Sequence, residues 1–181
     1  MDIRKTIDLL EAKSQTELKL IDLPYSRNAL SPVLSQRSLD NHYGKLAQGY
    51  VDRYNRKEGD PVFNDAGAYL HNVFFSQFRA VKTGNKPTGP VLALITRKYG
   101  DFNSNKEELT RQAMSIQGSG WIYMNRSGDI KIIKNHVRRN DIALLIDWWE
   151  HAWFDDYGTN KSKYLDGIWR IINWDIINSR L

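Results

Sequence analysis

The amino-acid sequence predicts an α+β protein with a small antiparallel sheet of three strands. Three observations lead to this fold class. Apolar residues at helical spacing dominate the first half of the chain and return at its end. Short strand-like segments are confined to residues 121–146. A stretch rich in Gly and Pro, residues 83–90, divides the chain into two halves, so helices come first and the strands follow among further helices.

The chain is expected to begin with a helix that precedes the main domain. Ile3, Ile7 and Leu10 fall on one helical face and predict a short amphipathic helix within residues 1–20. Pro24 and Pro32 then bracket a segment that is predicted to be extended.

Two longer helices are expected next, joined by a turn at residues 57–61. Ser35 or Ser38 can cap the first helix, which covers about residues 39–56. The second helix covers about residues 65–81. The inner side of the first helix carries apolar and aromatic residues at helical spacing: Tyr43, Leu46, Ala47, Tyr50, Val51 and Tyr54.

The second half of the chain should contain the sheet. Two alternating segments are separated by residues 126–129, whose sequence RSGD is typical of a hairpin turn. A third segment is continuously apolar, which is typical of a fully buried strand. The expected elements are helices at residues 91–99 and 106–116, strands at residues 121–125, 130–134 and 142–146, and a final helix at residues 162–179.

Composition limits the kinds of protein that the chain can represent. Hydrophobic residues make up 41% of its 181 residues and charged residues 26%, which favours a folded domain over a disordered chain. No apolar run approaches the ~20 residues of a membrane helix, and the N-terminus lacks the layout of a signal peptide, so we expect a cytoplasmic protein. The absence of cysteine excludes thiolate metal sites, and any metal must bind His, Asp or Glu. A net charge of +5 fits an anionic partner or simply a soluble surface.

Residues 142–157 are the most informative segment. Five apolar residues run directly into Asp147, which predicts a buried strand that ends at an acid. A carboxylate in that position is costly unless it is paired or bound to a metal. His151 follows four positions later, within a cluster of aromatic residues, and is close enough in sequence to bind the same metal.

The chain has four histidines, and each falls in a different predicted element. A lone histidine on an apolar helix face is usually a core residue, so the neighbouring residues decide the interpretation. His42 lies in the sequence LDNHYGK at residues 39–45, and His71 lies in NDAGAYLHNVFF at residues 64–75. His151 lies in DWWEHAWF at residues 147–154.

Together these motifs resemble the metal-ligand signatures of the iron/manganese superoxide dismutases. Shorter matches extend the resemblance over about residues 22–180: LPY at 23–25, KPTG at 86–89, GSGW at 118–121 and NWD at 173–175. The resemblance implies an N-terminal α-helical hairpin, residues 21–84, packed on a C-terminal α/β domain, residues 85–181, that carries the sheet. Residues 1–20 would be an extension of the hairpin domain.

The resemblance also implies a mononuclear centre that binds Fe or Mn, with one ion per subunit. Three imidazoles and one carboxylate would leave one position open for solvent. In the bacterial form of the second motif, which is one residue longer, Asn72 would occupy the ligand position. Leu70-His71 and residues 134–136 follow the archaeal form together, so we take His71. The candidate metal ligands are therefore His42, His71, Asp147 and His151.

Members of this family convert superoxide to dioxygen and hydrogen peroxide while the metal alternates between its +3 and +2 states. The resemblance places Tyr50 in the substrate funnel, with its hydroxyl available for a proton relay. It places His136 where archaeal members carry the side chain that bonds to solvent at the metal. Trp121, Trp149 and Phe75 would wall the metal, although plain core packing would also account for such residues.

The resemblance further implies a homodimer in which Glu150 reaches the neighbouring subunit's copy of His151. Two residues depart from the family at this interface. A family histidine four positions after the first ligand is Leu46 here, and a family tyrosine three positions after the last ligand is Phe154. In the family these two side chains hydrogen-bond across the dimer. Losing both is self-consistent, because losing one would leave the other without a partner.

These departures, together with a short hairpin, favour a second hypothesis. The chain would keep the dismutase fold but serve as a noncatalytic structural subunit of a larger assembly, such as a ribosome-like or viral particle. The N-terminal helix and the basic residues 134–139 would then be docking surface. Retention of all four candidate ligands favours the enzyme, because buried polar groups without a metal need other partners. A nucleic-acid-binding module fits least, because the chain lacks clustered base-stacking or phosphate-binding motifs.

Overall fold

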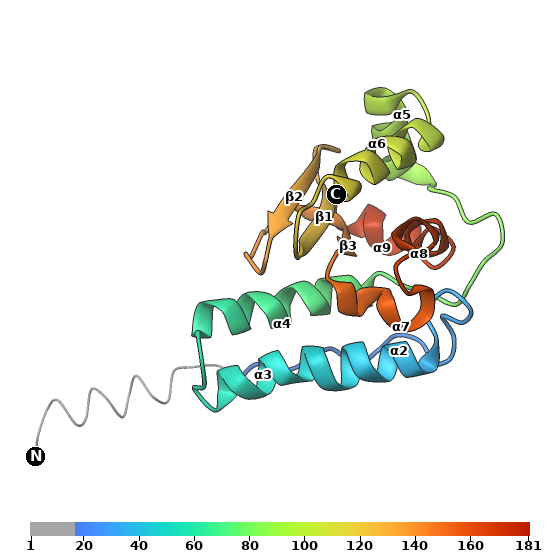
Figure 1. The fold of residues 1–181 in the computed structure, drawn as a ribbon. Coiled ribbons are helices and arrows are strands. Elements are labelled where there is room, and N and C mark those ends of the chain that lie inside the picture. Colours follow the sequence, from blue (N-terminus) through green and yellow to red (C-terminus); the bar gives the residue numbers. More distant parts are fainter. Residues whose placement is uncertain (1–16) are drawn as a thin grey trace, which may run out of the picture.

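The computed structural model describes residues 17–181 and shows a helical hairpin beneath a half that contains the sheet (Figure 1). The predicted α+β class and the three-stranded antiparallel sheet are confirmed. The helix predicted within residues 1–20 falls mainly on residues outside the described range, and residues 17–20 lie in no helix.

The first arm of the hairpin is a continuous helical stretch with a π-helical middle. It consists of α2 (Gln36–Asn41), the π-segment η1 (His42–Ala47) and α3 (Gln48–Asn55). The Ser35 hydroxyl accepts a hydrogen bond from the Ser38 amide at 3.1 Å, so Ser35 is the cap and the arm begins three residues earlier than predicted. The π-segment begins at His42, and such segments often mark functional positions in helices.

The second arm, α4 (Pro61–Ser76), starts and ends earlier than the predicted residues 65–81. Pro61 is the first residue of the helix and not the end of the preceding turn. The Asp60 carboxylate caps the helix by accepting hydrogen bonds from the amides of Val62 and Phe63. The helix ends because the backbone beyond Gln77 pairs with a distant segment, at the bridge between Phe78 and Ile172.

A short segment at the start of the described chain crosses both arms of the hairpin. The side-chain amide group of Asn55 accepts a hydrogen bond from Leu18 N and donates one to Leu18 O, both at 2.9 Å. The Asn72 amide accepts from Ile21 N and donates to Lys19 O, also at 2.9 Å. Two side-chain amides, one from each arm, therefore hold residues 18–21 against the hairpin.

The sheet has the strand order β2-β1-β3, with both pairs antiparallel. Its strands are β1 (Gly120–Asn125), β2 (Ile130–Lys134) and β3 (Ile142–Asp147). Every residue of β1 and β3 is buried, which explains the continuous apolar run before Asp147. The register pairs Trp121 with Asp147, so a tryptophan lies beside the acid at the end of the strand.

Helices surround the sheet and differ in part from the prediction. Asp101 caps α6 through the Ser104 amide, so this helix begins four residues before the expected position. The single helix predicted at residues 162–179 is wrong, because the chain breaks it at Ile172 to pair with Phe78. The surrounding elements are α5 (Gly89–Tyr99), α6 (Phe102–Met114), η2 (Glu150–Ala152), α7 (Phe154–Tyr157), α8 (Lys161–Ile168) and α9 (Trp174–Ser179).

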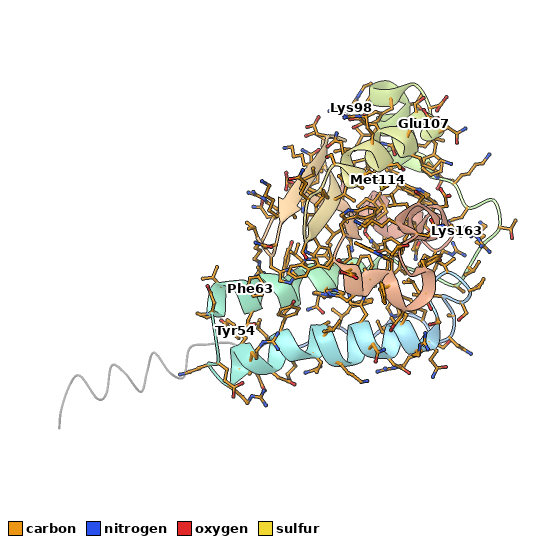
Figure 2. All side chains as sticks on the ribbon, viewed as in Figure 1. Tyr54, Phe63, Lys98, Glu107, Met114 and Lys163 are labelled. Atoms are coloured by element: carbon orange, nitrogen blue, oxygen red, sulfur yellow. The ribbon has the colours of Figure 1, made fainter. Side chains whose placement is uncertain are left out.

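The core joins the hairpin to the sheet. Side chains fill the space between the two halves, while Lys98 and Glu107 lie at the end of the molecule far from the hairpin (Figure 2). One hydrophobic cluster contains residues from both halves, and its largest fully buried members include Trp121, Trp148, Phe74 and Phe75. Within the described residues, no helix is long and apolar enough to cross a membrane.

Candidate metal centre

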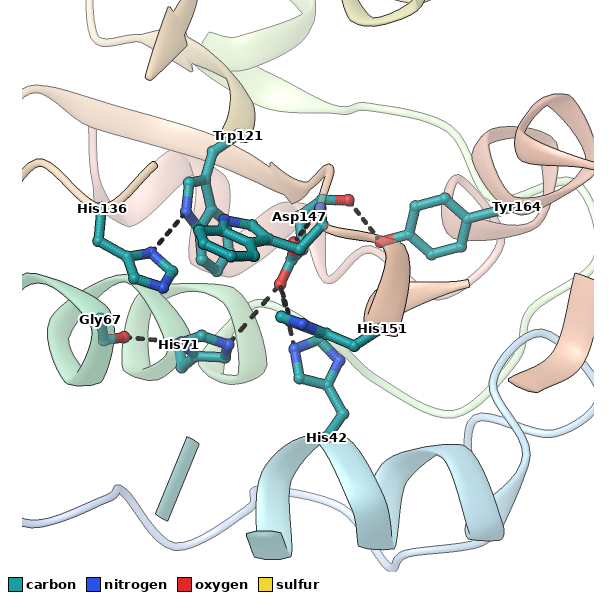
Figure 3. Close-up of polar contacts among 9 residues, drawn as sticks. His42, Gly67, His71, Trp121, His136, Asp147, His151 and Tyr164 are labelled. Carbon is teal, nitrogen blue, oxygen red and sulfur yellow. Dashed lines mark hydrogen bonds and ion pairs between the residues drawn. The ribbon is translucent and has the colours of Figure 1, made fainter. Parts of the chain in front are cut away.

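The four candidate ligands lie together where the hairpin meets the sheet (Figure 3). His42 opens the π-segment of the first arm, and His71 lies on α4. Asp147 is the last residue of β3, and His151 follows in η2. One possible ligand atom from each residue lies within 4.8 Å of all the others. The sequence prediction therefore identified residues that the fold brings to one point from three separate parts of the chain.

The four ligand atoms lie close together but form no hydrogen bonds with one another. Asp147 Oδ2 lies 3.1 Å from His42 Nε2, 3.3 Å from His151 Nε2 and 3.7 Å from His71 Nε2. Although these are ion-pair distances, none of the four atoms has a hydrogen-bond partner of acceptable geometry among residues 17–181. Buried polar atoms without partners are costly. A cation between them would remove that cost, and three imidazoles with one carboxylate suit Fe or Mn. The residues present thus fit the metal that the sequence predicts.

Hydrogen bonds to the backbone orient the two most buried ligands. His71 Nδ1 donates to the carbonyl of Gly67 at 2.7 Å, which leaves Nε2 facing Asp147. Asp147 Oδ1 accepts from the Trp149 amide at 2.8 Å, and the Tyr164 hydroxyl donates to the Asp147 carbonyl at 3.1 Å. The roles of Gly67 and Tyr164 are not evident from the sequence. The only sequence signal for Gly67 is its spacing of four residues before His71, which places it one helical turn away.

Burial sets the charges of this group. The pKa of His71 is well below its usual value because of burial and the neighbouring His42, and burial also lowers the pKa of His42. Burial by itself would raise the pKa of Asp147, but the adjacent His151 and His42 outweigh it and hold the pKa below the usual value. His42 and His71 therefore offer neutral imidazoles and Asp147 an ionised carboxylate, which are the protonation states that bind a metal.

His136 lies beside the group without belonging to it. Its Nδ1 accepts a hydrogen bond from Trp121 Nε1 at 3.1 Å, and its ring stacks on Trp149 with an interplanar angle of 19°. Burial lowers the pKa of His136 to about 4, so the ring is neutral at physiological pH. Because Nδ1 accepts, the proton resides on Nε2, which is buried and has no partner among the described residues. His136 therefore presents an N–H donor next to the centre that has no partner among the described residues.

Tyr50 lies beside both His71 and His136 and is 8% exposed. Its ring centroid is 4.8 Å from that of His136 and 5.4 Å from that of His71. Burial, assisted by the charge of Asp147, raises the pKa of Tyr50 to about 12, so its hydroxyl stays protonated. Gly67 makes this position possible, because a Cβ there would lie 2.8 Å from the tyrosine ring.

The aromatic side chains beside the centre also belong to the general core or pack against it. Trp121 meets the edge of the His71 ring at a centroid distance of 5.0 Å, and Phe75 meets His42 at 4.9 Å. Trp149 stacks on His151 at 5.8 Å. Asn72, the alternative ligand, does not join this group, because its amide binds the backbone of residues 19 and 21.

The opposite side of His151 faces the surface. The His151 side chain is 20% exposed and lines a cavity of about 300 Å³. Leu46 and Phe154, at 39% and 53% exposed, lie on the same cavity, as does Glu150. The predicted interface residues therefore form one partly apolar surface that leads to a candidate ligand.

The family model described as "Iron/manganese superoxide dismutases, alpha-hairpin domain" matches residues 17–60, and the model of the C-terminal domain of the same family matches residues 87–180. The Bacteroides fragilis "Superoxide dismutase [Fe]" is 36% identical over 88% of this chain and 96% of its own length. The Porphyromonas gingivalis "Superoxide dismutase [Mn/Fe]" is 35% identical over 90% and 98%. The Sulfolobus acidocaldarius "Superoxide dismutase [Fe]" is 31% identical over 88% and 90%.

Proposed function

The chain belongs to the iron/manganese superoxide dismutase family, and we propose that it converts superoxide to dioxygen and hydrogen peroxide at a single Fe or Mn ion. The observation that carries this proposal is the convergence of four buried or nearly buried ligand atoms that lack hydrogen-bond partners among residues 17–181. A fold that did not bind a cation would have no compensation for them.

His42, His71, Asp147 and His151 would hold the ion, whose change between two oxidation states supplies the one-electron chemistry. The chain's own residues supply orientation and charge. The ionised Asp147 carboxylate balances part of the positive charge of a cation, and its bond from the Trp149 amide keeps it turned toward the histidines. Trp121 and Phe75 exclude water from the inner side of the site.

Reduction of superoxide to peroxide consumes protons, and two side chains can hold protons close to the site. The Tyr50 hydroxyl remains protonated because burial raises its pKa to about 12. The proton on His136 Nε2 is fixed there by the hydrogen bond from Trp121 to Nδ1. We assign these two atoms as the hydrogen-bond donors nearest to bound substrate, which makes Tyr50 and His136 the candidate catalytic residues.

We also propose that the surface around Leu46, Glu150 and Phe154 is the contact between two copies of the chain. Burial of the exposed apolar side chains on this surface would be energetically favourable. Glu150 lies on the same cavity as the partly exposed His151. A second copy would supply a carboxylate to the outer face of this histidine and shield the centre from solvent.

The noncatalytic hypothesis stays open because of Leu46 and Phe154, neither of which can carry a proton at the mouth of the site. One experiment separates the two functions. The metal content of the purified protein and its rate of superoxide consumption are measured for the wild type and for Asp147→Ala. Stoichiometric Fe or Mn with superoxide consumption that Asp147→Ala abolishes supports the enzyme. Stoichiometric metal without activity supports the structural role, and absence of both metals refutes the dismutase.

A further inference from the structure

Strand β3 lies at the edge of the sheet, and its outer side faces α4. The Trp148 amide donates to the Gly120 carbonyl across to β1 at 2.9 Å. Backbone groups alternate in direction along a strand, so those of Leu145 point away from β1. They lie in the core, where unpaired backbone groups are costly. The outer edge of β3 therefore needs partners from outside the sheet.

Gln77 provides one set of partners. It is fully buried at the C-terminal end of α4. Its side-chain carbonyl accepts from Leu145 N at 3.1 Å, and its side-chain amide donates to Leu145 O. One side chain thus pairs with the strand edge as the peptide group of another strand would.

Arg180, the penultimate residue of the chain, connects the same two elements a second time. Its guanidinium donates to the Val73 carbonyl at 2.8 Å and to the Ser76 hydroxyl at 2.8 Å, both in the last turn of α4. It also donates to the Ala143 carbonyl on β3 at 3.0 Å and to the side-chain oxygen of Gln77 at 3.3 Å. A carbonyl in the last turn of a helix lacks an amide partner within the helix, so a cation there is well placed. The Ser76 hydroxyl also donates to the Val73 carbonyl, at 3.0 Å.

The Arg180 side chain is partly buried, and within residues 17–181 no carboxylate forms an ion pair with it. Its burial lowers the pKa of Arg180 to about 10. A cation that is partly removed from water and meets only neutral acceptors is costly. Arginine suits this position because its planar, forked donors can bridge several carbonyls at once.

These contacts lie next to two candidate metal ligands. Val73 follows His71 by two residues, and Leu145 precedes Asp147 by two residues. His71 Nε2 and Asp147 Oδ2 are 3.7 Å apart and have no direct hydrogen bond to each other. We propose that Gln77 and Arg180 form a lock that fixes α4 against β3 and thereby sets the distance between these two ligands, which makes Arg180 a positioning residue of the metal centre. This inference rests on the proposed metal binding but not on dismutase activity.

The test compares substitutions of Arg180, which directly follows α9, with a substitution of Asn178 within α9. Arg180→Met removes all four donor contacts of the lock. Asn178→Ala is the matched control, because Asn178 accepts from Val91 N at 2.8 Å and donates to Thr88 O at 2.9 Å, which ties the same helix to α5 and not to the ligand elements. Both variants lose stability, so stability alone does not test the lock.

The deciding measurements are the electron paramagnetic resonance spectrum of the Fe(III)-loaded protein and the rate at which a chelator removes the iron. We expect Arg180→Met to change the symmetry of the signal and to release iron about tenfold faster. The reason is that removing a residue that holds metal ligands in place weakens metal binding by about this factor. Asn178→Ala should keep the wild-type spectrum and release rate. Arg180→Lys keeps the charge but not the planar fork, and should give intermediate values, which also covers the case in which Arg180→Met does not fold.

An unchanged spectrum and release rate in Arg180→Met, or an equal change in Asn178→Ala, would overturn the lock while leaving the dismutase proposal intact. A wild type that binds no Fe or Mn would refute the proposed function instead. Hydrogen exchange on the metal-free protein then decides whether the lock exists. Arg180→Met should speed exchange at the Leu145 amide and leave the Trp148 amide, which bonds to β1, protected. If the Leu145 amide exchanged at the same rate in Arg180→Met as in the wild type, the lock would be overturned.

Discussion

The inner and outer sides of the metal centre are built on different principles. On the inner side, His42, His71 and Asp147 are essentially inaccessible to solvent, and the last two are oriented by hydrogen bonds to the backbone. On the outer side, His151 is 20% exposed and lies beside the exposed side chains of Leu46 and Phe154. The inner side is complete within one chain, whereas the outer side is an open surface.

This difference separates metal binding from catalysis. The inner side contains polar atoms that need a cation, and its geometry is fixed by residues that also form the core. Under the proposed function, the outer side would control access to the centre and contact with a second copy, and it carries the apolar Leu46 and Phe154 there. We therefore expect substitutions on the inner side to affect metal content, and substitutions on the outer side to affect rate and assembly.

The largest effect is expected at the centre of the inner side. Asp147→Ala removes the carboxylate on which three imidazoles converge, so the variant should lose its Fe or Mn and all superoxide consumption. Metal content is measured by mass spectrometry after purification. Asp166→Ala, an exposed acid on α8, is the control and should retain the metal.

The same pair of variants distinguishes a ligand from a stabilising side chain. A metal present at 100 times its Kd stabilises the folded state by about 2.7 kcal/mol, so removal of the metal should lower the thermal midpoint of the wild type and of Asp166→Ala. The midpoint of Asp147→Ala should not respond to added metal or to a chelator. A metal-dependent midpoint in Asp147→Ala would contradict the ligand assignment.

A smaller effect is expected where the two sides meet. His136→Leu removes the Nε2 donor but no ligand, so metal content should be unchanged while superoxide consumption falls about a hundredfold. His136→Gln restores a side-chain N–H donor of similar reach and should recover most of the loss. If His136→Leu lost the metal, or if Gln recovered nothing, His136 would be a structural residue and not a donor.

The sequence predicted which residues gather at the candidate centre more accurately than the bounds of the elements that carry them. Asp147 was identifiable because a carboxylate at the end of a buried apolar strand is costly in any fold. That argument needs no knowledge of tertiary contacts. The predicted start of α4 was wrong because Pro61 suits both a turn and a first helical position, and only the capping bonds of Asp60 decide between them.

Other features depend on contacts between distant residues and left no local signal. Apolar spacing continues through residues 162–179, yet the helix breaks because Ile171 O accepts from Arg79 N and Asn173 N donates to Gln77 O. Arg180 contacts residues about a hundred positions earlier in the chain. Such pairings are visible only when the whole chain has folded.

The next effect belongs to the outer side alone. Glu150→Gln removes a surface charge beside His151 and should weaken association of two copies about tenfold without changing metal content at high protein concentration. Sedimentation over a range of concentrations measures the association. Glu107→Gln, an exposed acid on α6, is the control and should associate as the wild type does. A wild type that stays monomeric at all concentrations would refute the proposed contact between two copies.

The smallest effect is also the most informative about the outer side, because it tests whether Leu46 and Phe154 act as a pair. If two copies bring these residues together, Leu46→His or Phe154→Tyr alone buries a polar group against an apolar partner and should slow superoxide consumption. The double variant lets the two polar groups bond, so its rate should exceed the product of the single effects by about fivefold, a coupling of about 1 kcal/mol. Purely multiplicative effects would mean that the two residues do not meet. The apolar surface would then be unrelated to turnover, and metal binding on the inner side would be compatible with a protein that does no catalysis.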